Sequence, residues 1–311
     1  MSKLRLGTRG SKLALWQANH AADLLRRAVP GLEVTIEVIK TQGDKILDVS
    51  LSKIGDKGLF TKEIELALLN NKVDLAVHSM KDLPSVLEPG LCIGAVLSRE
   101  NPQDVLLSRH AGGFAELPRG ARVGTSSLRR IAQIKASRPD LIIVDLRGNV
   151  DTRIRKMQKE GLDAIVLAYA GVKRLGYEDL ITEILPCDLL LPAVGQGAIG
   201  VEIRAGDNET AGILALIDHE PTRLGVLAER SFLRTLEGGC QIPIGALAEI
   251  TGEGLNLSGI VASLDGTVKY QGALQGKPEE AEEIGLSLAN QLLSRGAGQV
   301  LTEIRRLGDK K

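Results

Sequence analysis

Aromatic side chains and cysteines are both scarce in this chain. Phe, Trp and Tyr together account for 2% of the 311 residues, so the stacking surfaces on which proteins bind single-stranded nucleic acid are largely missing. The three cysteines, Cys92, Cys187 and Cys240, lie far apart and form no CxxC pair. This spacing gives no sign of a disulfide framework or a structural zinc site, so any important thiol must act alone.

Net charge and long apolar runs are missing as well. Lys plus Arg and Asp plus Glu each number 39, so the protein has no overall field that would attract nucleic acid or an anionic membrane. No apolar stretch reaches the roughly 18 residues of a membrane-spanning helix, and the opening MSKLRLGTRGSK lacks the apolar segment of a signal peptide. We expect a cytoplasmic monomer with no membrane or nucleic-acid partner.

Familiar nucleotide and metal motifs do not fit the chain either. Neither GxxxxGK[ST] nor HExxH occurs, so a P-loop and a zincin site have no support, and we expect no metal. The segment GQGAIG, residues 195–200, matches GxGxxG, but the following VEIR alternates like a strand. A dinucleotide-binding fingerprint must open a helix, and we therefore predict a glycine-rich hinge here.

What the chain does contain is an alternation of strand and helix patterns. Apolar residues make up 43% and charged residues 25%, which is typical of a globular protein. Residues 4–7 read as a strand, Ser11 as the cap of a helix, and 32–40 as an alternating strand. A similar series of strands and helices runs from 121 to 170. These βαβ patterns predict two successive α/β domains, which normally leave a ligand-binding cleft between them.

The last third of the chain has a different character. Asp265-Gly266 separates two strand-like runs and is a strong signal for a two-residue hairpin turn, and residues 278–295 begin with acidic residues and read as a helix. We predict a small α+β domain. The proposed boundaries are 1–99 with 197–217 for the first α/β domain, 100–196 for the second and 218–311 for the third. A Gly-Thr pair stands before a helix pattern in both α/β domains, at Gly7-Thr8 and at Gly124-Thr125. So short a similarity does not decide whether one domain is a duplicate of the other.

The turn GTSSLRR has the composition of an anion site. Thr125 and Ser127 offer hydroxyls, Arg129 and Arg130 offer forked cationic donors, and a helix N-terminus offers free backbone N–H groups. The alternative is that Ser126 merely caps the helix and that the arginines form a solvated face. The segment alone does not decide between the two.

A second cationic turn favours the anion site. Arg147, Asn149 and Arg153 follow the strand LIIVDL at the start of another helix, and Arg9 follows the first strand of the chain. A neutral protein that concentrates arginine at such turns is suited to a ligand with several carboxylates or phosphates.

Asp82 and Cys240 are the candidates for chemistry. Asp82 ends the segment HSMKD, where Pro84 prevents a helix from continuing and leaves the carboxylate at a constrained strand end. The alternative is a surface pair with Lys81, and His78 reads as a satisfied core or rim histidine. Cys240 follows two glycines in EGGCQIPIG and is the best nucleophile candidate, although an unreactive loop thiol is the competing interpretation.

Residues 43–60 mix glycine, lysine and aspartate between a strand and a helix and end on Phe60. They form either a lid or an ordinary surface loop.

Taken together, these motifs resemble the hydroxymethylbilane synthase (porphobilinogen deaminase) family. The resemblance runs in order along nearly the whole chain, through LGTRGSKLALWQA, TQGDKILD, GLFTKEIE, AVHSMKDLP, VGTSSLRRIAQI, LRGNVDTRIRK, LAYAGVKRLG, LLPAVGQGAIGVEIR and EGGCQIPIGA. It implies an α/β fold with two domains like those of type II periplasmic binding proteins and a small third domain carrying Cys240.

The resemblance also implies the chemistry. Cys240 would hold a dipyrromethane cofactor through a thioether, and porphobilinogen would lose ammonia to give an azafulvene that the cofactor attacks. Four such additions and a final hydrolysis give the linear tetrapyrrole hydroxymethylbilane. Asp82 would stabilise positive charge on the pyrrole nitrogen and relay protons.

Further site residues follow from the matching motifs. The cofactor-binding set comprises Cys240, Lys81, Asp82, Thr125, Ser127, Arg129, Arg130, Arg147 and Asn149. The substrate-binding set comprises Arg9, Ser11, Phe60, Arg147, Arg153, Arg174 and Gln196.

Two other functions compete with this interpretation. A non-enzymatic anion- or solute-binding protein would use the same two-domain cleft, but the missing export signal argues against it. A nucleic-acid-binding regulator would use the basic helices, but zero net charge and few aromatics argue against it.

Overall fold

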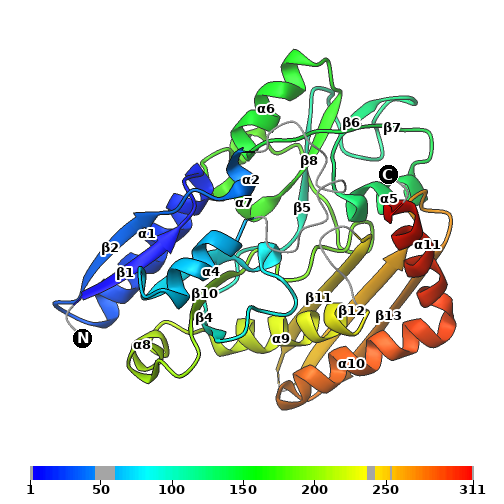
Figure 1. Cartoon of the computed structure of the whole chain (residues 1–311). Coiled ribbons are helices and arrows are strands. Elements are labelled where there is room, and N and C mark those ends of the chain that lie inside the picture. Colours follow the sequence, from blue (N-terminus) through cyan, green and yellow to red (C-terminus); the bar gives the residue numbers. More distant parts are fainter. Residues whose placement is uncertain (1–2, 46–59, 237–241, 253, 310–311) are drawn as a thin grey trace.

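Three β-sheets organise the chain (Figure 1). The computed structural model describes residues 3–45, 60–236, 242–252 and 254–309. Among these, no helix is both long and apolar enough to cross a membrane.

The first sheet has the strand order β2-β1-β3-β10-β4. Its strands are β1 (Lys3–Thr8), β2 (Glu33–Val38), β3 (Leu75–Ser79), β4 (Leu91–Val96) and β10 (Ile199–Arg204). β1 pairs in parallel with β2 and β3, whereas β10 runs antiparallel to both β3 and β4. A strand from far downstream therefore completes the first sheet.

The second sheet repeats this arrangement in the order β7-β6-β8-β5-β9. Its strands are β5 (Asp104–Ser108), β6 (Arg122–Gly124), β7 (Ile142–Val144), β8 (Ala164–Ala168) and β9 (Glu183–Ile184). β6 is parallel to β7 and β8, and β5 is antiparallel to β8 and β9. β5 thus occupies the place that β10 has in the first sheet, and the predicted pair of α/β units is confirmed.

Helices cover these two sheets, and their starts follow the predicted capping chemistry. Ser11 accepts a hydrogen bond from the backbone N–H of Ala14, and the helix behind it buries Ala18, Ala21 and Leu25 against the first sheet. The helices are α1 (Lys12–Ala28), α2 (Gln42–Lys45), α4 (Lys62–Leu69), α5 (Leu128–Ser137), α6 (Val150–Lys159), α7 (Tyr169–Arg174) and α8 (Asn208–Leu214). Short 3-10 helices are η1 (Met80–Asp82) and η2 (Glu178–Leu180).

Two crossing segments join the α/β units and lie beside each other. The amide of Leu97 donates to the carbonyl oxygen of Ile199, and that of Glu100 donates to Gly197. Gly197 has a φ of +88°, and a Cβ there would collide with the carbonyl oxygen of Glu100. Because the strand β10, and not a helix, follows this glycine segment, GQGAIG is not a dinucleotide fingerprint, and its role as a hinge stays a prediction.

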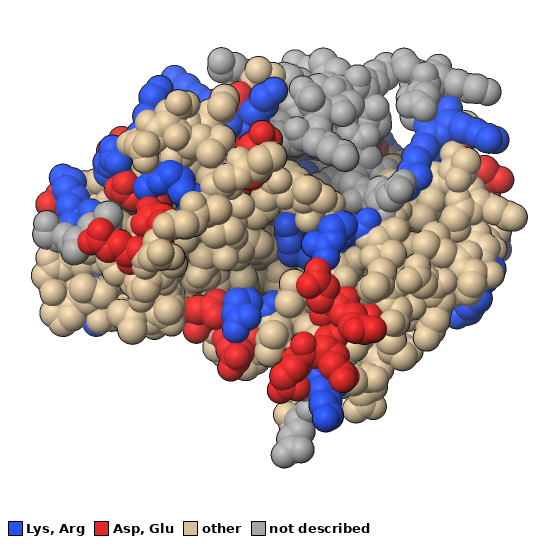
Figure 2. All heavy atoms as spheres, turned by 60° about the horizontal axis from the view of Figure 1, so that its bottom comes forward, with Lys and Arg blue, Asp and Glu red and all other residues tan. Residues whose placement is uncertain are grey.

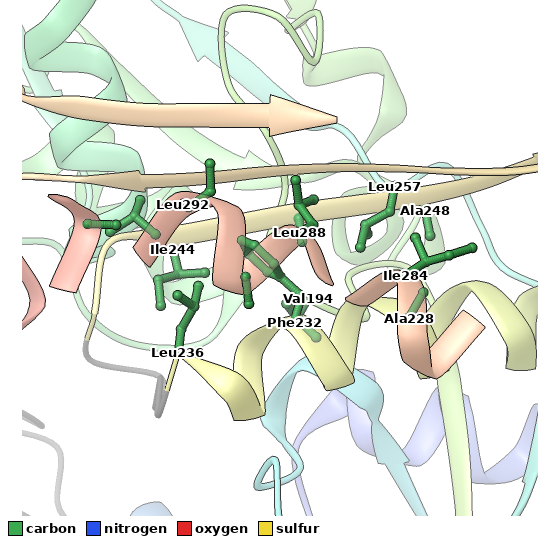
Figure 3. Close-up of a cluster of buried hydrophobic side chains, with 14 of the residues drawn as sticks. Val194, Ala228, Phe232, Leu236, Ile244, Ala248, Leu257, Ile284, Leu288 and Leu292 are labelled. Atoms are coloured by element: carbon green, nitrogen blue, oxygen red, sulfur yellow. The ribbon is translucent and has the colours of Figure 1, made fainter. Parts of the chain in front are cut away.

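The third sheet is an antiparallel meander of β11 (Ile244–Thr251), β12 (Gly254–Ala262) and β13 (Lys269–Gly276). α9 (Glu220–Thr235), η3 (Pro278–Glu280), α10 (Ala281–Leu292), the π-helical turn η4 (Leu293–Ala297) and α11 (Gly298–Asp309) complete this unit. Its core forms where α9 and α10 bury Phe232, Leu288 and Leu292 against β12 (Figure 3). The small α+β unit is therefore as predicted.

The hairpin turn of this unit is longer than predicted. β12 ends at Ala262 and β13 begins at Lys269, because the side chains of Ser263 and Asp265 bond to the loop backbone. The proposed boundaries 1–99 with 197–217, 100–196 and 218–311 stay a prediction.

Candidate functional site

Asp82 lies at the exposed end of a turn whose beginning is buried. β3 ends at Ser79, and η1 then carries Met80, Lys81 and Asp82 before Pro84. The Met80 side chain is buried in an apolar cluster with Leu83, and its amide donates to the carbonyl oxygen of Ala198. Burial of Met80 and Leu83 therefore anchors the backbone on both sides of Asp82, whose side chain is exposed.

Lys81, its neighbour, is only partly exposed. Burial lowers the pKa of its ammonium group, Arg130 and Arg129 act in the same direction and Asp82 and Asp104 in the opposite one, and the net pKa is about 8. Lys81 therefore lies among cations and carboxylates and is not simply the surface partner of Asp82.

The N-terminus of α5 is capped by Ser127, which accepts a hydrogen bond from the amide of Arg130. The amide of Ser127 in turn donates to Thr125 Oγ1 over 3.2 Å. Ser126, the alternative cap, instead donates to the carbonyl oxygen of Leu146. The suggestion that Ser126 caps this helix is therefore wrong.

Arg129 and Arg130 are each only 5% exposed, so they do not form a solvated face. Both pair with the fully buried Asp104, through Arg129 Nη1 at 2.8 Å and Arg130 Nη2 at 2.7 Å. Their Nη1 groups also donate to the carbonyl oxygens of Leu191 and Val166. Three charged groups are thus fixed beneath the start of α5.

Asp104 is ionised in this setting. Burial alone would raise the pKa of its carboxyl group, but the charges and hydrogen bonds of Arg129 and Arg130 outweigh burial and hold the pKa well below its usual range. Gln196 joins the cluster, because its Nε2 donates to Asp104 Oδ1 over 2.9 Å and to the carbonyl oxygen of Pro102.

Several polar atoms of this cluster have no hydrogen-bond partner within the described part of the chain. They are Nε of Arg129, Nε of Arg130, Oε1 of Gln196 and Oδ2 of Asp104, which has only its ion pair with Arg129. A buried donor that makes no hydrogen bond costs about 1–3 kcal/mol. Carboxylate oxygens of a ligand would therefore stabilise the two guanidinium groups.

Arg153 extends the cluster from α6. Its Nε donates to the carbonyl oxygen of Gly148, and burial together with the nearby Arg130 lowers its pKa to about 10, opposed by Asp82 and Asp145. Arg147 pairs with Asp145 over 2.9 Å. Arg153 is thus the electrostatic link between the second cationic turn and Asp82.

Asn149 is the N-cap of α6, but its exposed side chain makes no capping hydrogen bond.

Arg9 and Phe60 form a separate pair. The Arg9 guanidinium lies 4.2 Å from the centre of the Phe60 ring, which is a cation–π contact. Ser11 is close by in sequence and uses its hydroxyl to cap α1. Lys12 and Asp151 approach within 3.8 Å and bring this end of α1 towards α6.

The Arg174 side chain contacts α1 and a crossing segment rather than the cluster around Asp104. Its Nη2 donates to the carbonyl oxygen of Gly197 over 2.7 Å, and its guanidinium lies 5.4 Å from the centre of the Trp16 ring. Burial lowers its pKa to about 10, opposed by Glu100. These contacts join α7 to α1 and a crossing segment, not to Asp104.

The structure describes two of the three cysteines, Cys92 and Cys187. Cys240 falls in 237–241, outside the described residues, as does most of the suggested lid 43–60. Burial raises the pKa of both Cys92 and Cys187, which makes them poor nucleophiles at neutral pH. Cys240 therefore stays the predicted nucleophile.

Sequence analysis does not single out Asp104 or Glu229. Glu229 is fully buried and accepts hydrogen bonds from Arg99, Gly195 and Ala248, which ties the third unit to both crossing segments. A buried acid with distant partners leaves no local sequence signal.

His78 is buried, as predicted, and lies 3.2 Å from Glu202. Within the described residues, no group of three His, Cys, Asp or Glu side chains is arranged to hold a metal ion.

On the face shown in Figure 2, small groups of Lys and Arg side chains alternate with groups of Asp and Glu, so no broad basic surface covers it. The cations of the candidate site are instead gathered around Asp82 and Asp104; they are Lys81, Arg129, Arg130 and Arg153. Fold and site together define a two-unit α/β protein that gathers cationic side chains around two carboxylates where its units meet.

The chain belongs to the porphobilinogen deaminase family. The family model "Porphobilinogen deaminase, dipyromethane cofactor binding domain" matches residues 4–212, and "Porphobilinogen deaminase, C-terminal domain" matches residues 223–294. The porphobilinogen deaminase of Syntrophomonas wolfei is 59% identical over 98% of this chain and 100% of its own length. Those of Carboxydothermus hydrogenoformans and Moorella thermoacetica are 60% and 54% identical, over 97% and 100% of this chain and 97% and 99% of their own lengths.

Solved structures resemble the chain more distantly. The VFT2 domain of Bordetella pertussis BvgS gives a TM-score of 0.42 at 15% identity, covering 69% of this chain and 85% of that one. The aliphatic sulphonate binding protein SsuA of Escherichia coli gives 0.40 at 14% identity, covering 76% and 71%. Likeness this low carries no functional inference.

Proposed function

We propose that the protein is a hydroxymethylbilane synthase that joins four porphobilinogen molecules, with loss of ammonia, on a covalent dipyrromethane primer and releases hydroxymethylbilane by hydrolysis. The observation that carries the proposal is the cluster of buried cations beside Asp82, on a chain of the porphobilinogen deaminase family. An alternative solute-binding function has no support from the family relationship.

The cationic cluster fits a cofactor with several carboxylates. Each pyrrole ring of dipyrromethane carries an acetate and a propionate, and Nε of Arg129 and Nε of Arg130 are buried donors without an acceptor among the described residues. The residues that would hold these groups are Lys81, Thr125, Ser127, Arg129, Arg130, Arg147 and Asn149. When bound through Cys240, the cofactor supplies the nucleophilic pyrrole carbon.

Asp82 is the catalytic residue of this proposal. Loss of ammonia from porphobilinogen spreads positive charge onto the pyrrole nitrogen, and a fixed carboxylate next to that N–H stabilises the charge. The Asp82 carboxylate is exposed at the end of η1 and lies within the electrostatic reach of Lys81 and Arg153. As a carboxylate that is exposed to the substrate side, it can also accept and return a proton.

Substrate carboxylates would bind to cationic and polar residues around this carboxylate. We assign Arg9, Ser11, Phe60, Arg147, Arg153, Arg174 and Gln196 to this role. Arg153 has the strongest support, since it couples to Asp82. Arg174 has the weakest, since its guanidinium contacts Trp16 and Gly197.

A turnover assay tests the proposed function. The purified protein should consume porphobilinogen, release one ammonia per substrate and give one hydroxymethylbilane for every four substrates. A solute-binding protein would instead return porphobilinogen unchanged. We further propose that the enzyme acts in the cytoplasm as a monomer, which sedimentation at micromolar concentration would check.

A further inference from the structure

Asp104 is the common partner of the two buried arginines at the start of α5. It is the first residue of β5, it is fully buried, and it contacts Arg129, Arg130 and Gln196 at 2.7–2.9 Å. It lies beneath the cluster and is assigned to no step of the reaction proposed above.

The charges of this group do not cancel. Arg129 and Arg130 carry two positive charges, and Asp104 supplies one negative charge, so one positive charge is left over. Two buried guanidinium groups would repel each other without the carboxylate between them. Asp104 therefore lets both cations stay buried while the group as a whole still attracts an anion.

The geometry is fixed on several sides. Arg129 is also held by the carbonyl oxygen of Leu191 and Arg130 by that of Val166, while Gln196 Nε2 holds Asp104 Oδ1. Nη1 of Arg129 and both Nη groups of Arg130 are occupied, whereas the buried Nε groups of the two arginines have no acceptor among the described residues.

We propose that Asp104 is a positioning residue, which fixes Arg129 and Arg130 so that they bind carboxylates of the dipyrromethane cofactor. This inference rests on the proposed assignment of both arginines to the cofactor. It predicts that removing the charge of Asp104 impairs cofactor attachment more than it impairs folding.

The test compares Asp104→Asn with a matched variant, Asp74→Asn. Asp74 is also a buried aspartate between two arginines, since it pairs with Arg5 at 2.7 Å and lies 3.8 Å from Arg204. Asp74 lies just before β3, however, and Asp82 lies beyond the opposite end of that strand, so Asp74 is not part of the proposed site. Intact mass gives the fraction of each purified variant that carries the cofactor, and thermal unfolding gives its stability.

We expect Asp104→Asn to reduce the ratio of cofactor-carrying to bare chains at least about tenfold, as for the loss of a charged hydrogen-bonding partner. Asp74→Asn should carry the cofactor as the parent does, even if it unfolds at a lower temperature. Equal cofactor content in the two variants at comparable stability would overturn the proposal.

A conservative variant separates charge from packing. Asp104→Glu keeps the charge but not the shape, whereas Asp104→Asn keeps the shape but not the charge. Positioning by charge predicts higher cofactor content in Asp104→Glu, and a purely structural role predicts the reverse. If Asp104→Asn does not fold, Asp104→Glu decides alone. Cofactor content within about threefold of the parent then supports the proposal, and a folded variant without cofactor contradicts it.

Arg129→Leu and Arg130→Leu distinguish this inference from the assignment on which it rests. If both lose cofactor while Asp104→Asn keeps it, the inference fails and the assignment stands. If neither loses cofactor, the assignment itself is wrong, and the inference falls with it. If all three lose cofactor and the double variant Asp104→Asn/Arg129→Leu is no worse than Arg129→Leu, Asp104 acts through the arginine.

Discussion

At the scale of single residues, Asp82 combines two properties that rarely occur together on a surface turn. Its carboxylate is exposed, while Met80 two residues earlier is buried and immobilised. A carboxylate that is accessible and fixed needs little reorganisation when positive charge develops beside it. The same turn also carries Lys81, whose pKa is lowered mainly by burial and further by Arg130 and Arg129.

Asp82→Asn should slow turnover at least about a hundredfold, as expected when a preorganised charge is lost. The protein should remain folded with its cofactor attached, because the side chain is exposed. Steady-state porphobilinogen consumption and intact mass measure the two effects. Glu88→Gln, an exposed acid on the same connection, is the control and should change neither. Near-normal turnover in Asp82→Asn would remove the residue from the mechanism.

Arg147→Leu should weaken binding of carboxylate groups by about 1.5–3 kcal/mol, the loss of one charged hydrogen bond. Its ion pair with the largely exposed Asp145 contributes little to stability. Porphobilinogen kinetics give the change in kcat/KM. Arg155→Leu, an exposed arginine on α6, is the matched control. Equal kinetics for the two variants would show that Arg147 meets no carboxylate.

Lys81 gives a pH dependence whose sign is fixed by its pKa. Burial lowers that pKa to about 8, so the ammonium is charged below pH 8 and loses its proton as the pH rises through it. Attachment of the anionic cofactor should therefore slow between about pH 7.5 and 9 relative to Lys81→Arg, which stays charged. The attachment rate, followed by mass, measures this. Parallel pH profiles for the two proteins would contradict the assignment.

At the scale of secondary-structure elements, the helix starts were the most predictable features. Ser11 caps α1 as predicted, since a serine before an apolar helical repeat acts locally. Strand lengths were less predictable: LIIVDL, residues 141–146, looks like one strand, but β7 covers only Ile142–Val144. Val38 shares a predicted face with Leu32, yet it is 53% exposed. Burial at strand ends depends on neighbours distant in sequence.

The site shows the same limit. Sequence motifs selected Arg129 and Arg130 as candidate anion-binding residues, and that role stays a prediction. Their burial could not be predicted, because their partner Asp104 lies in β5, and the place of β5 in the sheet is set only by folding. Likewise, Arg174 carries a family motif, but packing against Trp16 decides its direction.

Gly197 offers a test at this scale, because its φ of +88° suits glycine alone and a Cβ would collide with Glu100. Gly197→Ala should reduce the free energy of unfolding by more than about 1–2 kcal/mol. Gly212→Ala, in α8 with open space around it, should stabilise by about 0.4–1 kcal/mol. Denaturant unfolding measures both. An unchanged free energy of unfolding in Gly197→Ala would contradict this, because it would mean that the crossing segments shift to accommodate the added methyl group.

At the scale of the whole molecule, the two crossing segments link everything that the site needs. They pass from one sheet to the other beside Asp104 and Gln196, and Glu229 ties them to the third unit through Arg99 and Gly195. The third unit also carries Cys240 between the end of α9 and the start of β11. In the proposed function, Cys240 of the third unit presents the cofactor to the cationic side chains of the two α/β units.

This organisation was predictable in part. Strand and helix periodicity predicted two α/β units and a small α+β unit, and composition argued against nucleic-acid binding. The place of β10 in the first sheet followed from the family resemblance, because periodicity says which segments are strands and not which strands pair.

The most direct test of the account is the intact mass of the purified protein, with peptide mapping around Cys240. The account predicts an excess mass equal to dipyrromethane on the Cys240 peptide, and none on the peptides of Cys92 and Cys187. A Cys240 that stays unmodified in the purified protein and after incubation with porphobilinogen would contradict it.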